Sequence, residues 1–159
     1  MRFVDTTAMP EVHAHAILTV RARRAWGPTV TGYVLLSRDA FSPRADLDRS
    51  SGVVVRRGHS LQGEGIAQRV LACSAASGGV AGGWAFYEMR TRGVSPAAML
   101  FNVANPVMVQ GAVVAGIAIM DGFECNLLDA LCTGDRVIVD PKIRAVTVVE
   151  RRCHEAGPG

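Results

Sequence analysis

The stretch IAQRVLACSAASGGVAGGWAFYEMRTRGVSPAAMLFNVANPVMVQGAVVAGIAIM, residues 66–120, decides the fold. Three short apolar runs in it are predicted as strands: 66–73, 98–103 and 117–120. Between them, residues 80–92 and 106–115 carry the spacing and the end signals of helices. Strands that alternate with helices in this order pair in parallel with right-handed crossovers. The stretch therefore predicts a central βαβαβ unit.

Particular residues support the two helices. Asn105 offers a side-chain acceptor at a helix cap, and Pro106 presets the backbone at the first helical position. In the first helix, one face carries two small and two large residues, and we expect it to approach the sheet closely. These residues are Gly82, Ala85, Phe86 and Met89.

The flanking segments read mainly as further strands. Residues 12–24 and 30–36 are predicted strands joined by a turn at Gly27-Pro28, and 53–55 is a short strand. A closing hairpin is expected from 136–140 and 145–149 around Pro141-Lys142, whereas 38–52 is polar and turn-rich and 121–133 is ambiguous. The predicted class is α/β, a mixed sheet or partly closed barrel flanked by helices. We expect one domain over 1–159, with a core at about 12–150 and a frayed tail at 155–159.

Composition narrows the classes of function. The net charge is +3 and the basic residues are scattered, which does not favour nucleic-acid binding. The N-terminus lacks the pattern of a signal peptide, and no apolar run reaches membrane-spanning length, so we expect a cytoplasmic chain without a membrane partner. Charged residues make up only 19%, which suggests that a partner covers some apolar surface.

No metal site of its own is predicted for this chain. The cysteines are Cys73, Cys125, Cys132 and Cys153. They form no C-x-x-C motif and have no histidine at ligand spacing, so they are interpreted as buried or incidental thiols in a reducing cytosol. His13 and His15 alternate on a predicted strand, but no third ligand is in view, and they are interpreted as surface histidines.

The segment CSAASGG, residues 73–79, leaves two interpretations open. It is either a tight packing turn or a loop whose bare backbone binds a small anion at a helix start. Gly78 and Gly79 lack β-carbons where a carboxylate would approach, and the turn before Asn105 should lie beside them. Ser77 is either a helix cap or a reactive hydroxyl. No neighbouring His or Lys activates it, and the G-x-S-x-G motif is absent.

Ordered landmarks over residues 32–149 resemble a known family. They are GYVLLSRDAFSPRADLDRSSGVVV at 32–55, GHSLQGEGIAQRVLACSAASGGVAGGWAFYEMRTRG at 58–93, NPVMVQGAVVAGIAIMDGF at 105–123 and TGDRVIVD at 133–140. Together they are similar to the small subunit of the aconitase X family. The resemblance implies a swivelling β/β/α domain that lies over the active site of a separate large subunit.

The resemblance also implies a hydro-lyase reaction. The large subunit would carry an iron or iron–sulfur centre, and a serine of the small subunit would remove a proton from carbon. Ser77 matches that serine by its place between strand and helix. Family members of the bacterial type resemble dehydratases of cis-3-hydroxy-L-proline, which yield Δ1-pyrroline-2-carboxylate, and members of the archaeal type resemble phosphomevalonate dehydratases. Because glycine and alanine follow Ser77 instead of further serines, we favour the hydroxyproline substrate.

Further residues are expected around the substrate. Ser42 and Arg44 lie in a loop that the family keeps near the active site, and Arg44 either pairs with a carboxylate or is a solvated charge. The other predicted contacts are Ser74, Gly78, Gly79 and Asn105. His59 is interpreted as a turn residue. A different class of function also stays open, in which the domain acts alone as a binding module for a small carboxylate.

Overall fold

The computed structural model describes residues 16–152, apart from the side chains of Val80 and Ala81. The predictions for His13 and His15, for the start of the first strand and for the tail at 155–159 lie outside these residues. In the described part of the chain, no helix is long and apolar enough to cross a membrane.

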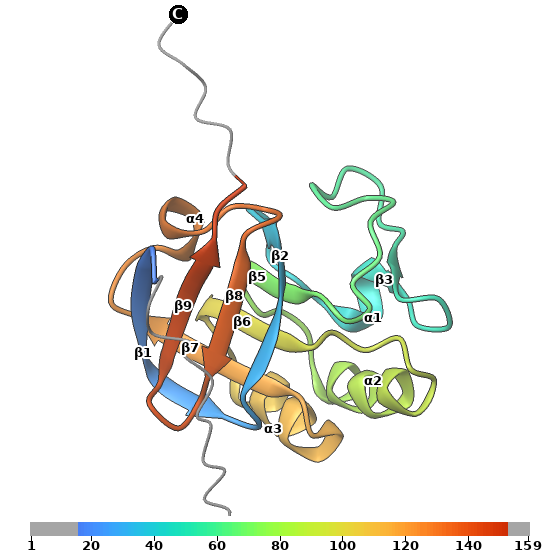
Figure 1. Ribbon diagram of the computed structural model, residues 1–159. Helices are drawn as coiled ribbons and strands as arrows, with labels where there is room; N and C mark the ends of the chain where they lie inside the picture. The colour runs from blue at the N-terminus through green and yellow to red at the C-terminus, as the bar shows by residue number, and fades with distance from the viewer. Residues whose placement is uncertain (1–15, 153–159) are drawn as a thin grey trace, which may run out of the picture.

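The described strands close into a barrel, which extends the predicted partly closed sheet (Figure 1). The order around it is β1-β7-β6-β5-β2-β8-β9. The bounds are β1 Leu18–Trp26, β2 Val30–Ser37, β5 Val70–Ala75, β6 Ala98–Val103, β7 Ala118–Phe123, β8 Arg136–Asp140 and β9 Ala145–Glu150. β2, β5, β6 and β7 run parallel, and β1, β8 and β9 pair antiparallel with their neighbours. A short ribbon of β3 (Leu47–Asp48) and β4 (Val53–Val54) lies outside the barrel.

The parallel strands bury both of their faces, which explains their continuous apolar sequences. Along β5, Val70 and Ala72 belong to the hydrophobic cluster to which every barrel strand contributes. Leu71 and Cys73 belong to a second cluster, which β5 shares with the helices α2 (Val80–Thr91) and α3 (Pro106–Ala115). Both helices lie on the same side of the barrel in Figure 1.

Helix ends follow the predicted signals, with additions that the sequence did not reveal. Asn105 caps α3 by accepting a hydrogen bond from Met108 N at 2.8 Å, and Gly116 ends that helix in the left-handed conformation. The short helix α1 (Pro43–Asp46) lies in the segment predicted to be polar and turn-rich, and the short helix α4 (Leu127–Ala130) lies in the segment whose structure the sequence left ambiguous. The strand predicted from residue 66 begins only at Val70, because Gln68 has φ +60°, which an extended strand does not allow.

Glycines set how closely α2 packs against its neighbours. Gly82 was expected to approach the sheet, but it faces Pro43 of α1, whose Cγ would lie 3.4 Å from an added β-carbon. Ala85, Phe86 and Met89 are buried as predicted. α2 crosses α3 where Gly83 meets Gly111, and a β-carbon on Gly111 would lie 2.5 Å from the Cα of Gly83.

The crossing yields a stability test. Gly111→Ala should force the two helices apart and lower the free energy of unfolding by about 1–3 kcal/mol, despite the higher helix propensity of alanine. Gly82→Ala is the matched control, because its new methyl group meets only Pro43 at ordinary contact distance. Urea unfolding of both variants checks this. Equal stability of the two variants would contradict the close crossing.

Candidate active site at the carboxyl edge of the parallel strands

The carboxyl ends of β2, β5, β6 and β7 meet at one edge, where ligands gather in open α/β sheets. Three loops leave this edge, at residues 38–42, 76–79 and 104–105. The end of β7 adds Asp121 beside them. The predicted site loops are therefore neighbours in space.

The Ser77 hydroxyl lies in the loop between β5 and α2. The backbone N of Ser77 donates to the Phe41 carbonyl at 2.9 Å, so the loop continues the sheet for one residue past β5. The N-cap of α2 is Gly79, and no side chain among the described residues caps this helix, so the interpretation of Ser77 as a cap is wrong. Within the described residues, the Ser77 hydroxyl makes no hydrogen bond, and the residue is half-buried. The hydroxyl is thus available to a ligand.

Gly78 and Gly79 differ in their surroundings. Gly78 has φ +106°, and a β-carbon on it would lie 2.9 Å from Ser42 Oγ. Ser42 is buried and caps α1, with its Oγ accepting from Ala45 N at 3.4 Å. Gly79 is extended and meets nothing within 4 Å of an added β-carbon. Of these residues, Gly79 is the more open to a ligand.

Asn105 is a structural link as well as a cap. Its Oδ1 accepts from Met108 N at 2.8 Å, and its Nδ2 donates to the Gly78 carbonyl at 3.3 Å. The side chain therefore ties the start of α3 to the loop that carries Ser77. A substrate contact by Asn105 would compete with these bonds.

The remaining predicted contacts lie on opposite sides of the sheet. Ser74 follows the alternation of Val70 and Ala72 and so shares the inner face of the barrel, beside Asn102 of β6. Arg44 is exposed on α1 and forms no ion pair within the described residues. The structure brings Ser42, Ser77, Gly78 and Asn105 together, since Ser42 lies beside Gly78 and Asn105 binds the Gly78 carbonyl. It does not bring Ser74 or Arg44 into that group.

Sequence reasoning missed two buried aspartates at this edge. Asp46 is fully buried and accepts from Ser42 N at 2.7 Å and from Arg56 Nη1 at 3.1 Å. The only sequence signal for it was its place at the end of the polar run after Ser42.

The second missed aspartate is Asp121. It is 3% exposed and accepts from Ala104 N at 3.1 Å through Oδ2. Arg24 binds it through two nitrogens, Nε at 2.8 Å and Nη2 at 2.6 Å, and this carboxylate holds the pKa of Arg24 above its usual value. A carboxylate directly after a predicted apolar strand was the available signal.

A cleft of about 300 Å³ adjoins this pair. Its walls include Trp26, Pro106 and Val109, and Arg24 and Asn105 are also among its lining residues. The cleft lies between β1 and the first turns of α3. It therefore borders the site loops without containing Ser77.

His59, interpreted as a turn residue, is buried next to a turn. Its Nδ1 accepts from Leu61 N at 3.1 Å, so the proton sits on Nε2, which faces the Ala40 carbonyl at 3.3 Å. Its Nε2 also lies 3.8 Å from Asp46 Oδ2. The imidazole supports the loop that precedes Ser42.

The described residues hold no group of three or more His, Cys, Asp and Glu side chains that would bind a metal ion. Burial raises the pKa of the Cys73 thiol, and Cys125 is exposed with its pKa raised by partial burial and nearby carboxylates. The expectation of a free thiol is wrong for Cys132, which is disulfide-bonded. Residue spacing does not show which thiols the fold brings together.

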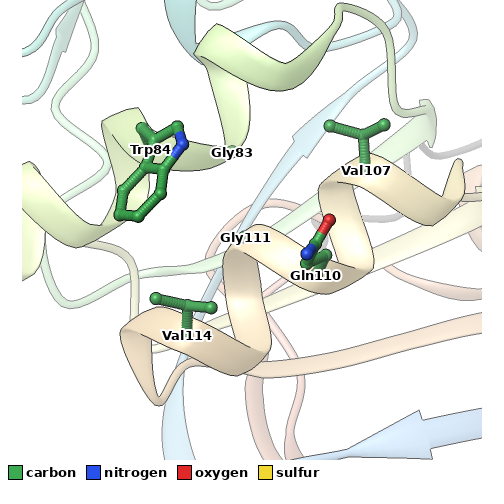
Figure 2. A pocket seen from close by; sticks show the side chains of 6 residues that line it. All are labelled: Gly83, Trp84, Val107, Gln110, Gly111 and Val114. Carbon is green, nitrogen blue, oxygen red and sulfur yellow. The ribbon is translucent and has the colours of Figure 1, made fainter.

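A small groove of about 90 Å³ lies between α2 and α3 (Figure 2). Gly83 and Gly111 approach each other closely at the bottom of this groove, and Trp84 of α2 and Val114 of α3 line its two sides. Trp84 and Tyr87 on the outer side of α2 are both largely exposed. This face contains no part of the serine loop.

Comparison with known proteins now gives the class of the domain. Residues 19–148 match the family model described as Aconitase X swivel domain. The chain therefore belongs to the aconitase X swivel domain family, which confirms the resemblance found in the sequence.

Relatives of the chain carry a more specific name. It is 33% identical over 123 residues to the phosphomevalonate dehydratase small subunit of Methanocella arvoryzae, covering 77% of this chain and 93% of that protein. It is 34% identical over 120 residues to the protein of the same name from Methanococcoides burtonii, covering 76% and 88%.

Solved structures agree with the fold. Thermococcus kodakaraensis aconitase X in its holo-form superposes with a TM-score of 0.78 at 25% identity, over 84% of this chain and 99% of that one. A UPF0107 protein solved by solution NMR gives a TM-score of 0.77 at 25% identity, over 84% and 100%. The predicted swivel-type α/β fold is thereby confirmed.

The two loop glycines should respond differently to substitution. Gly78→Ala places a side chain at φ +106° and against Ser42 Oγ, so it should lower the free energy of unfolding by about 1–3 kcal/mol. Gly79→Ala, in extended backbone and open space, should change it by less than about 0.5 kcal/mol. Urea unfolding followed by tryptophan fluorescence measures both. A Gly79 variant as unstable as the Gly78 variant would refute this loop geometry.

Proposed function

We propose that this chain is the small subunit of a two-subunit aconitase X-type dehydratase, in which Ser77 is the base. The observation that carries the proposal is a serine hydroxyl at the carboxyl edge of the parallel strands, which makes no hydrogen bond within the described residues, in a member of the aconitase X swivel domain family. The names of the relatives, all small subunits, support a large partner subunit. The whole active site would form only when the two subunits meet.

In the proposed reaction, the deprotonated Ser77 Oγ takes a proton from the substrate carbon. The electron pair of that C–H bond forms the new double bond, and the C–O bond on the neighbouring carbon breaks. The hydroxyl leaves with its electron pair and gains a proton to become water, while Ser77 later returns its proton to solvent. An iron or iron–sulfur centre in the large subunit would supply the Lewis acid for the departing hydroxyl.

A serine hydroxyl is a poor base in water, so the local groups must stabilise its alkoxide. The start of α2 carries backbone amides that no described side chain caps, and the helix dipole is positive at this end. The Gly79 backbone is open beside it. Such preorganised donors act most strongly where water is excluded, which we assign to coverage by the large subunit.

We propose phosphomevalonate as the substrate. The names of the relatives support it over the hydroxyproline substrate that we favoured from the glycines after Ser77. Phosphomevalonate carries a phosphate and a carboxylate, and Arg44 on α1 is exposed and forms no ion pair within the described residues, whereas Arg24 and Arg56 are already paired with Asp121 and Asp46. Guanidinium groups bind both kinds of anion with charge-assisted hydrogen bonds.

The second candidate substrate is cis-3-hydroxy-L-proline. The observation in its favour is that Gly78 and Gly79 offer no side-chain hydroxyl to a phosphate. Its single carboxylate would need fewer donors than phosphomevalonate. Both candidates require the same base and the same partner.

The test is co-production of this chain with the large subunit from the same cells, followed by dehydration assays on both substrates. We expect turnover of phosphomevalonate, and Ser77→Ala should lower kcat by at least about 100-fold because a positioned base contributes on that order. Ser74→Ala, three residues earlier on β5, is the matched control. It should keep kcat within about threefold, since its side chain shares the inner face of the barrel.

Other outcomes would discriminate the alternatives. Turnover of hydroxyproline alone would select the second substrate. Full activity of Ser77→Ala would remove Ser77 from the chemistry. If no large subunit associates, and calorimetry shows the isolated chain binding a small carboxylate, the chain is a binding module instead of an enzyme subunit.

A further inference from the structure

The Ser77–Gly78 loop is held by a different chain segment on each of its two sides. On one side, Phe41 O accepts from Ser77 N at 2.9 Å, and the Ser42 side chain packs against Gly78. On the other side, Asn105 Nδ2 donates to the Gly78 carbonyl at 3.3 Å. The position of the Ser77 hydroxyl therefore depends on where these two segments lie.

Each of the two segments is fixed by one buried carboxylate. Asp46 accepts a hydrogen bond from Ser42 N at 2.7 Å, and Ser42 directly follows Phe41, whose carbonyl binds Ser77 N. Asp121 accepts a hydrogen bond from Ala104 N at 3.1 Å, and Ala104 directly precedes Asn105, whose side chain binds the Gly78 carbonyl. Each aspartate therefore binds the backbone amide of one residue, and a neighbouring residue of the same segment binds the Ser77–Gly78 loop.

Each of these two aspartates forms an ion pair with a largely exposed arginine. Arg56 binds Asp46 and is 57% exposed, and Arg24 binds Asp121 and is 74% exposed. A largely exposed arginine compensates only part of the cost of burying a carboxylate, so stability alone does not account for either pair. Hydrogen bonds from backbone amides to a charged acceptor are, however, short and directional, as positioning requires.

We infer that Asp46 and Asp121 are positioning residues, which hold the Ser77 hydroxyl in place from the two sides of its loop. This inference rests on the proposed function of Ser77 as the base. Neither aspartate touches the reacting atoms. Each sets the place of a segment, and the segments set the place of Ser77 and Gly78.

The chain contains a matched control for this role. Asp135 is also fully buried, accepts from the backbone amides of Cys132 at 3.0 Å and Arg152 at 3.2 Å, and lies 3.4 Å from the Arg151 guanidinium. Its chemistry is the same, but it holds the turn before β8 to the segment after β9. Within residues 16–152, none of its hydrogen bonds reaches the loop segments at Ser42, Ser77 or Asn105.

The first experiment compares Asp46→Ala, Asp121→Ala and Asp135→Ala in the complex with the large subunit. Activity is expressed per assembled complex, isolated by size exclusion, so that lost assembly does not count as lost turnover. We expect kcat to fall by on the order of 10- to 100-fold for Asp46→Ala and Asp121→Ala, as for a catalytic group displaced by a fraction of an ångström to 1 Å, with KM within about threefold. Asp135→Ala should keep kcat within about threefold.

A second variant covers the case in which an alanine variant does not fold. Asn105→Ser keeps a side-chain oxygen that can cap α3 but removes the nitrogen that reaches Gly78 O. We expect kcat to fall, KM to stay within about threefold and the urea midpoint to stay the same. A raised KM with unchanged kcat would instead make Asn105 a substrate contact and would contradict its role as the link to Asp121.

The second measurement does not need activity. In ¹H–¹⁵N spectra of the full-length chain, Asp46→Ala and Asp121→Ala should both shift the amide signals of Ser77 and Gly78, although they act from opposite sides. Asp135→Ala should leave these signals in place. An inactive wild-type complex would contradict the proposed function, while the spectra would still decide the positioning. Unmoved Ser77 and Gly78 signals in both variants, or equal effects from Asp135→Ala, would overturn it.

Discussion

The closure of the barrel by β1 is the constraint on which the rest of the structure depends. Residues 18–21 of β1 pair with β9, and residues 22–26 pair with β7, so one strand joins the two ends of the sheet. Without it, β7 and β9 would expose unpaired backbone groups, and the inner hydrophobic cluster would open to water. The same strand places Arg24 opposite Asp121, 97 positions away in the sequence. Closure and site therefore share one ion pair.

The central unit could be predicted because its signals are local. The strand at residues 98–103 and the helix at 106–115 appear with the predicted bounds, since apolar runs and the Asn105-Pro106 cap act within a few residues. In the closing hairpin, β8 has its predicted bounds and β9 ends one residue later than predicted. Predictions failed where a single backbone angle set the start of a strand, as at Gln68. They also failed where a small residue packs against a segment distant in the sequence, as Gly82 does against Pro43.

The site was predicted only in part, for the same reason. Ser77, Gly78 and Asn105 come from the ends of predicted strands, so the topology placed them together. Asp46 and Asp121 were missed because no local sequence pattern encodes their contacts. The buried Asp46 carboxylate binds the backbone amide of Ser42, and Asp121, on a different strand, binds that of Ala104. Ser74 was predicted as a substrate contact, but strand alternation places it on the inner face of the barrel, apart from the Ser77 loop, and its role stays a prediction.

A domain with this arrangement suits a site that is shared between two subunits. The Ser77 hydroxyl is half-buried and unbonded within the described residues, so the chain by itself leaves it accessible and weakly basic. A partner that covers this edge would remove water and strengthen the interaction of the hydroxyl with the amides at the start of α2. If Ser77 is the base, covering the edge would improve catalysis only with Ser77 already in place, because each unfixed torsion would otherwise have to be ordered on binding. Rigid support from within the small subunit, on both sides of the loop, meets that requirement, and it explains why carboxylates are buried where apolar side chains would pack more easily.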